Sequence, residues 1–90
     1  MSFAHRGLKR LFERGDAGAV RPDLLDKVRT ILELLDAAQS AEAIRLPVLR
    51  LHALKGGLKG YYAVTVNANW RIVFRFEGGN AHDVELIDRH

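Results

Sequence analysis

The sequence contains no cysteine, so disulfide bridges and thiolate metal sites are excluded and a reducing compartment is favoured. It also lacks any apolar run that approaches the roughly 20 residues of a membrane-spanning helix. The N-terminal stretch MSFAHRGLKR has no apolar segment of the kind found in signal peptides. From these absences we expect a cytoplasmic protein that makes no use of a membrane.

Residue types that serve several kinds of catalysis are scarce as well. Only two serines occur, Ser2 and Ser40, and neither belongs to a nucleophile motif. Residues 55–60 are rich in glycine, but they lack the Gly-Lys-Ser/Thr ending of a phosphate-binding P-loop and precede a predicted strand. The four histidines do not follow the spacing of metal ligands on one helical turn; they are His5, His52, His82 and His90. We therefore expect no metal and no cofactor.

What is present is sufficient for one small folded unit. The chain has 90 residues, of which 48% are hydrophobic, and this argues against general disorder. The formal net charge of +3 at pH 7 is compatible with a partner that carries phosphate groups, although the solvated surface of any small basic protein has the same balance. We expect residues 1–90 to form a single domain.

The strongest structural signal is an alternation of apolar and polar residues between positions 62 and 76. The segment Asn67-Ala68-Asn69 interrupts it with residues that tolerate turn conformations, so the stretch predicts a β-hairpin. In the second strand of this hairpin, the apolar side is formed by Trp70, Ile72, Phe74 and Phe76. The opposite side carries Arg71, Val73 and Arg75.

Two further strands are expected on either side of the hairpin. Residues 48–52 also alternate, with Leu49 and Leu51 on one side and Val48, Arg50 and His52 on the other. A last strand is expected over residues 81–87, after a glycine-rich turn at residues 77–80. The sheet should therefore have one apolar face that needs a cover and one face that carries arginine and histidine.

Helical spacing precedes these strands. Residues 7–14 place Leu8, Leu11 and Phe12 on one side of a short helix that Gly15 is suited to end. Residues 22–38 begin with a proline and carry a leucine-rich stripe that can cover the apolar face of the sheet. A further turn is expected over residues 41–45, capped by Ser40. The predicted fold class is α+β, with two N-terminal helices packed on one face of a small, mostly antiparallel sheet.

The predicted uncovered face of the sheet gathers cations and imidazoles. RNA cleavage needs a base that removes the proton of the 2′-hydroxyl, an acid that protonates the leaving 5′-oxygen, and cations that stabilise the phosphorane. Histidine suits proton transfer and arginine binds phosphate, so the residue types on this face fit that chemistry. The alternation alone also fits an exposed strand face that carries Arg and His for solubility.

Three segments together resemble a known family. They are SFAHRGLKRLFERG, LHALKGGLKGYYAVTVNANWRIVFRF and the terminal Asp-x-His, and they resemble HigB-type toxins of bacterial toxin–antitoxin systems, within the RelE/ParE superfamily. The resemblance implies a RelE/ParE-like fold and a ribosome-dependent endoribonuclease, an mRNA interferase that cleaves mRNA in the decoding site. It also implies a HigA-like helix-turn-helix antitoxin as partner, through which alone operator DNA is contacted.

The resemblance further implies roles for single residues. A histidine in the motif Leu-His-x-Leu-Lys matches His52, and the terminal aspartate and histidine match Asp88 and His90; these three would be the catalytic residues of a metal-independent reaction. Arg89 stands where many relatives have tyrosine, and it can bind phosphate or stack but cannot act as a general acid near neutral pH. The candidate residues for RNA or phosphate binding are Arg50, Lys55, Arg71, Arg75 and Arg89.

Two other functions remain open on the sequence. One is a superfamily toxin with another target, such as DNA gyrase, although such a poison needs no general acid or base and would leave His52, Asp88 and His90 unexplained. The other is a non-catalytic basic module that binds nucleic acid or only a partner protein. A small helix-turn-helix protein encoded by the neighbouring gene would favour either toxin over the module.

Overall fold

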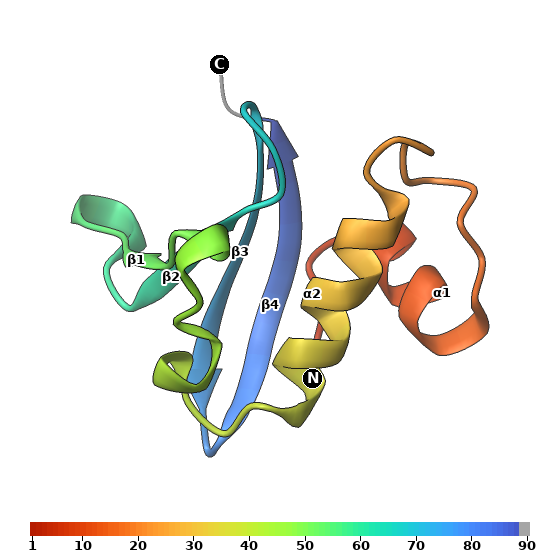
Figure 1. The fold of residues 1–90 in the computed structure, drawn as a ribbon. Coiled ribbons are helices and arrows are strands. Elements are labelled where there is room, and N and C mark those ends of the chain that lie inside the picture. Colours follow the sequence, from red (N-terminus) through yellow and green to blue (C-terminus); the bar gives the residue numbers. More distant parts are fainter. Residues whose placement is uncertain (89–90) are drawn as a thin grey trace.

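A computed structural model describes residues 1–88 of the chain. The helices are α1 (Arg6–Arg14) and α2 (Leu25–Ala37), and the strands are β1 (His52–Ala53), β2 (Tyr61–Thr65), β3 (Trp70–Glu77) and β4 (Asn80–Asp88). The strands form one sheet in the order β1-β2-β3-β4, and each neighbouring pair is antiparallel. Figure 1 shows both helices on the same side of this sheet. The predicted α+β architecture is thereby confirmed.

Helix α1 begins one residue before the predicted range of 7–14 and ends before Gly15, as predicted. The Nδ1 atom of His5 accepts a hydrogen bond of 3.1 Å from the backbone N–H of Leu8, and this caps the N-terminus of the helix. Gly15 has a φ of 71°, a left-handed conformation that glycine adopts without steric cost, and its N–H donates to the Leu11 carbonyl. The helix therefore stops where the chain must turn toward α2.

Helix α2 is slightly shorter than expected, because residues 22–24 form a separate turn before it. The Leu24 N–H donates to the carbonyl of Arg21, three residues back, so the chain there has not yet reached α-helical geometry. The predicted stripe is nevertheless buried, and it consists of Leu24, Val28, Ile31, Leu32 and Leu35. These side chains cover the apolar face of the sheet, as expected.

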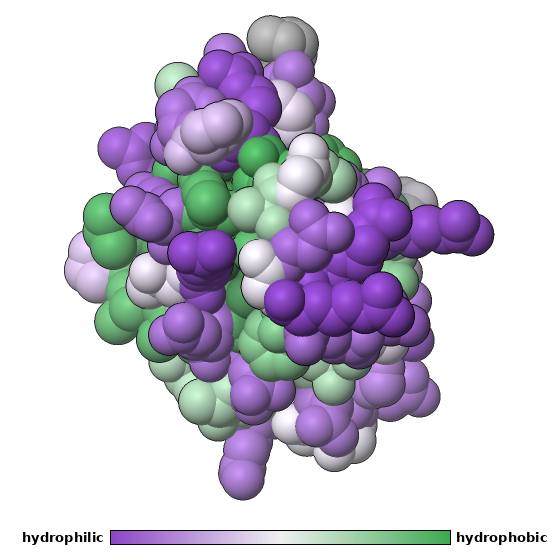
Figure 2. Space-filling model, turned by 90° about the vertical axis from the view of Figure 1, so that its right-hand side faces the viewer, coloured by the Kyte–Doolittle hydropathy of each residue, from purple (hydrophilic) through white to green (hydrophobic). Residues whose placement is uncertain are grey.

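The sheet meets this stripe with its own apolar face. Val64, Ile72 and Phe74 are completely buried, and they come from the two central strands. The ring of Phe74 stacks on Tyr62 with centroids 6.1 Å apart and meets the edge of Phe76 at 5.7 Å. The outer side of the helix layer is mostly hydrophilic, with apolar patches between the charged side chains (Figure 2).

The prediction of a strand over residues 48–52 is wrong. Pro47–Leu49 forms a 3₁₀ turn instead, and Arg50 has a φ of 50°, which breaks any extended alternation. Proline has no N–H for a sheet ladder and suits the first position of a helical turn, so it starts this turn rather than a strand. Of the described residues before β2, the ladder with β2 contains only His52 and Ala53.

The turn after α2 also differs in detail from the expectation. Ala41–Ile44 forms a 3₁₀ helix, but Ser40 makes no side-chain hydrogen bond that caps it. The glycine-rich residues 55–60 include a 3₁₀ turn at Gly56–Leu58.

Neither helix within residues 1–88 is long and apolar enough to cross a membrane.

We expect Phe74→Ala to lower the free energy of unfolding by about 3–5 kcal/mol, the usual cost of truncating a large aromatic side chain in a core. Trp70→Ala should cost clearly less, because the ring of Trp70 is only partly buried and lies at the edge of the core. Chemical denaturation followed by circular dichroism measures both, with Phe74→Leu as a milder control. Equal losses in the two alanine variants would mean that Trp70 belongs to the core as fully as Phe74.

Candidate functional site

The strand register determines which residues lie side by side on the face of the sheet away from the helices. His52 lies opposite Ala63, Ala63 opposite Val73, and Val73 opposite Glu85, so these four residues form one row across all four strands. Residues directly opposite one another point to the same side of a sheet. His52 and Glu85, at the two ends of this row, are exposed, whereas Ala63 and Val73 in the middle are buried.

His52 stands at the β1 end of this row with an exposed imidazole. Its Nδ1 atom lies 3.2 Å from the carbonyl oxygen of Arg50. That oxygen can only accept a hydrogen bond, so the contact favours the tautomer with the proton on Nδ1. The Nε2 atom then keeps its lone pair and is free to accept a proton.

Arg71 is the cation that the structure fixes on this face. Its Nη1 atom donates to the carbonyl oxygens of Asn67, Ala68 and Trp70 at 2.7, 3.2 and 3.1 Å. These carbonyls hold the guanidinium against the β2–β3 turn without neutralising it, because no carboxylate within residues 1–88 pairs with it. Nε and Nη2 remain available for the two-pronged contact with phosphate that arginine favours.

Two further predicted cations surround β1. Arg50 precedes the strand and Lys55 follows it, and both side chains are exposed. Neither forms an ion pair with a carboxylate among the residues described. Together with Arg71 they form what we call the basic end of the sheet face, defined as Arg50, Lys55 and Arg71.

Arg75 differs from these three cations. Its Nε donates to Asp83 at 2.7 Å and its Nη1 to Glu77 at 2.6 Å. These contacts raise the pKa of Arg75 and hold the pKa values of both carboxyl groups below their usual range. Because two carboxylates already offset its charge, Arg75 is poorly placed to act as the phosphate ligand that the sequence predicts.

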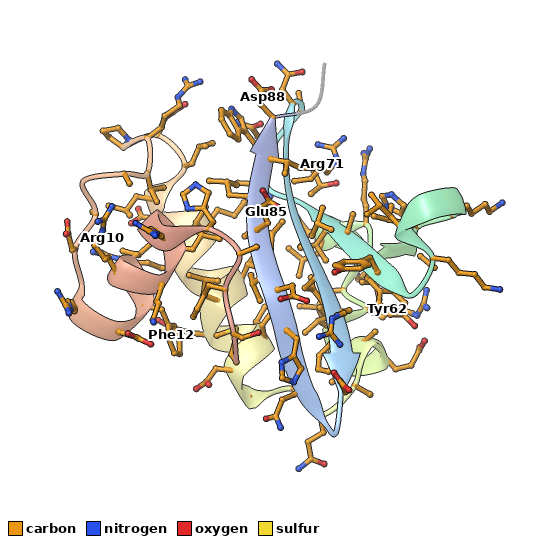
Figure 3. All side chains as sticks on the ribbon, turned by 180° about the vertical axis from the view of Figure 1, so that it is seen from behind. Arg10, Phe12, Tyr62, Arg71, Glu85 and Asp88 are labelled. Atoms are coloured by element: carbon orange, nitrogen blue, oxygen red, sulfur yellow. The ribbon has the colours of Figure 1, made fainter. Side chains whose placement is uncertain are left out.

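Asp88 does not lie beside His52. It lies at the C-terminal end of β4 (Figure 3). It is paired with Trp70, so it shares the strand side of Trp70 and not that of Arg71. With about 4.8 Å between strands and about 3.3 Å per residue, the Cα atoms of Asp88 and His52 are on the order of 17 Å apart. The other two predicted residues of the tail, Arg89 and His90, lie outside the described part of the chain.

Sequence reasoning missed a second group of polar residues on this face. Tyr61, Asp83 and Glu85 come from β2 and β4, and the Tyr61 hydroxyl donates to Asp83 at 3.4 Å. Strand alternation alone could not have placed Glu85 opposite Val73, because β4 gains one residue between His82 and Glu85. No group of three or more His, Asp or Glu side chains in residues 1–88 is arranged to hold a metal ion.

Comparison with known proteins decides the family. A model of the HigB-like toxins, described as the RelE-like toxin of the type II toxin–antitoxin system HigB, matches residues 1–90. The chain belongs to the HigB-like toxin family. This confirms the resemblance read from the sequence and places the chain among toxins that are paired with an antitoxin.

Individual members of the HigB-like toxin family are similar along much of their length. The chain is 39% identical over 89 residues to Endoribonuclease HigB of Proteus vulgaris, and the match covers 99% of this chain and 97% of that protein. It is also 39% identical over 56 residues to Toxin HigB-1 of Vibrio cholerae serotype O1, a match that covers 61% of this chain and 59% of that protein.

The Arg75 ion pairs predict a specific response to acid. Because Arg75 lowers the pKa of Asp83, the stabilisation from this pair is complete above the unfolded-state pKa of about 3.9 and is lost as the pH falls through the folded value. In Arg75→Gln the pKa of Asp83 should rise toward its ordinary value, and acid should remove less stability than in the parent. Carboxyl NMR titration measures the pKa, and denaturation at neutral and acidic pH measures the stability.

Lys9→Gln is the matched control for this titration, because it removes an exposed cation of α1 that pairs with no carboxylate in the described residues. The Asp83 titration should be unchanged in that variant. An unchanged Asp83 pKa in Arg75→Gln as well would show that the ion pair does not control this carboxyl group.

Proposed function

We propose that this toxin is an endoribonuclease that cleaves mRNA on the ribosome, in the decoding site, and so inhibits translation in the cytoplasm. The observation that carries the proposal is the sheet face itself, where exposed His52 lies in the short strand between Arg50 and Lys55 and shares the face with Arg71, three cations that no carboxylate in residues 1–88 neutralises. The name of the Proteus vulgaris relative, an endoribonuclease similar over nearly the whole chain, supports the same activity.

His52 acts as the general base in the proposed reaction. Its Nε2 takes the proton of a ribose 2′-hydroxyl, the 2′-oxygen forms a bond to the adjacent phosphorus, and the bond from phosphorus to the 5′-oxygen breaks. The products are a 2′,3′-cyclic phosphate and a 5′-hydroxyl. Arg71 and Lys55 stabilise the negative charge that builds on the non-bridging oxygens, with Arg50 holding a neighbouring phosphate.

The C-terminal residues complete this mechanism. We assign to His90 the role of the acid that protonates the leaving 5′-oxygen, since imidazole exchanges protons near neutral pH. Asp88 lies on the Trp70 side of β4, so its proposed role is to orient the tail rather than to meet His52 directly. Arg89 would contact phosphate or stack on a base in place of the tyrosine found in many relatives.

The ribosome is the proposed source of substrate because the sheet face has few cations to hold free RNA. Each phosphate contact adds a salt-sensitive increment of affinity, and the three cations of the basic end supply only a small total. The partner that restrains the toxin is a HigA-like helix-turn-helix antitoxin, which would also make the contact with operator DNA. A toxin directed at DNA gyrase would need neither His52 nor the cations arranged around it.

Expression without the antitoxin tests the proposal. Growth should stop, and mapped mRNA ends should fall within translated codons; purified toxin should cleave ribosome-bound mRNA far better than free mRNA. In His52→Ala the cleavage rate should drop by roughly 10²–10⁴-fold, the usual loss of a general base. Its melting temperature should be unchanged because the imidazole is exposed.

Lys9→Gln again provides the control, since it removes an exposed side chain of α1 that we place outside the reaction. Growth arrest with intact mRNA and inhibited DNA supercoiling would replace the ribonuclease with a gyrase poison. Harmless expression of folded protein would favour a non-catalytic module.

The tail provides a separate prediction. Removal of His90, or Asp88→Ala, should abolish cleavage while antitoxin binding and the melting curve stay close to those of the parent, because terminal residues contribute little to packing. Cleavage on ribosomes and a thermal melt of each variant are the measurements. Full activity without His90 would remove it from the mechanism, and a collapsed melting temperature would make the tail structural.

A further inference from the structure

A pocket of about 270 Å³ opens on the sheet face that also carries His52. Val73 and Ile87 form its apolar floor, Leu58 and Tyr61 its walls, and Asp83 and Glu85 its polar edge. Pockets for drug-sized ligands typically measure about 300–1,000 Å³, so this one suits a smaller, flat group. The lining is apolar and acidic, and no cation lines it.

The two carboxylates at this edge are not equivalent. Asp83 accepts hydrogen bonds from Arg75 at 2.7 Å and from Tyr61 at 3.4 Å, so its charge and one of its oxygens are already engaged. The backbone of Glu85 pairs with Val73, but its side chain is exposed and forms no hydrogen bond or ion pair with another residue in the range 1–88. The pocket thus presents one free carboxylate, a group that accepts hydrogen bonds and donates none when ionised.

This chemistry discriminates between the parts of a nucleotide. A phosphate would be repelled by the carboxylates, whereas a flat base can fill the apolar floor and donate an N–H to Glu85. Adenine, cytosine and guanine each carry an amino group that can donate in this way. Uracil has no amino group, and carbonyl oxygens flank the ring N–H on its pairing edge. One of these oxygens would lie against the carboxylate of Glu85, and two hydrogen-bond acceptors repel each other.

The position of Glu85 relates the pocket to the proposed reaction. Glu85 and His52 end the same row of the sheet, and three strand spacings of about 4.8 Å put their Cα atoms about 14 Å apart. Arg71 lies on β3, one of the two strands between them and the neighbour of the strand that carries Glu85 (Figure 3). A phosphate held at the basic end can therefore extend its neighbouring base toward Glu85.

We propose that this pocket binds one base of the mRNA beside the cleaved bond, and that Glu85 selects a base with an amino group over uracil. The proposal rests on the proposed ribonuclease function and adds a specificity-determining residue to it. Glu85 takes no part in the bond changes; it positions the nucleotide whose phosphate the basic end holds.

Mapping of mRNA ends tests the selection. The parent should cleave codons that offer an amino-bearing base at one fixed position at least roughly fivefold faster than codons with uracil there, as one good base contact allows. In Glu85→Gln, whose amide both donates and accepts, this preference should collapse while cleavage persists. Glu33→Gln, on the exposed side of α2, is the matched control and should keep the parental preference.

A binding measurement separates this proposal from the ribonuclease itself. Methyl NMR of Val73 and Ile87 should shift on addition of adenosine or cytidine monophosphate, respond less to uridine monophosphate, and lose that difference in Glu85→Gln. This result would support the pocket even if no mRNA were cleaved. Methyl signals that do not move with any of the nucleotides would overturn it, and so would a codon preference in Glu85→Gln identical to that of the parent.

Discussion

One extra residue in β4 determines what each face of the sheet presents. Between Val73 and Arg75 the chain of β3 advances two residues, while its partner β4 advances three, from His82 to Glu85. The additional residue, Asp83, adopts a positive φ of 53°. Because a shift of one residue sends every following side chain to the opposite face, this bulge turns Val84 and Leu86 into the core and leaves Glu85 and Ile87 on the open face.

Two contacts hold the bulge, one from the N-terminal segment and one from the neighbouring strand β3. The hydroxyl of Ser2 accepts the Asp83 N–H at 3.0 Å, a backbone donor that the bulge would otherwise leave without a partner in the ladder. Arg75 binds the Asp83 carboxylate from the neighbouring strand. The same bond leaves Arg75 less able to bind a ligand at the surface. The two arginines on this side of β3 therefore differ: Arg75 is paired with carboxylates and fixes the register, whereas the charge of Arg71 is not offset by a carboxylate in residues 1–88.

The same bulge marks the limit of what the sequence predicts. The helices, the hairpin and its apolar side could be predicted from periodicity, because burying residues such as Ile72 and Phe74 lowers the free energy of the folded state. The residues before β1 could not be placed this way, since alternation at residues 48–52 competes with a proline that begins a turn. The position of Glu85 was missed because the sequence pattern gives no sign of the inserted residue in β4. The same insertion puts the Asp88 side chain on the Trp70 side of the sheet.

The open face is therefore divided by charge, and the division has a consequence for any RNA strand that crosses it. Arg50, Lys55 and Arg71 offer unpaired positive charge toward β1 and the β2–β3 turn, whereas Glu77, Asp83 and Glu85 put negative charge along β3 and β4. A strand with its phosphates over the acidic part would meet like charge, so the electrostatics favour phosphates at the basic end and a base over Glu85. A face of uniformly basic side chains would bind RNA in many registers. In the proposed mode of binding, the charge division favours the arrangement in which a phosphate at the basic end also lies beside the Nε2 atom of His52.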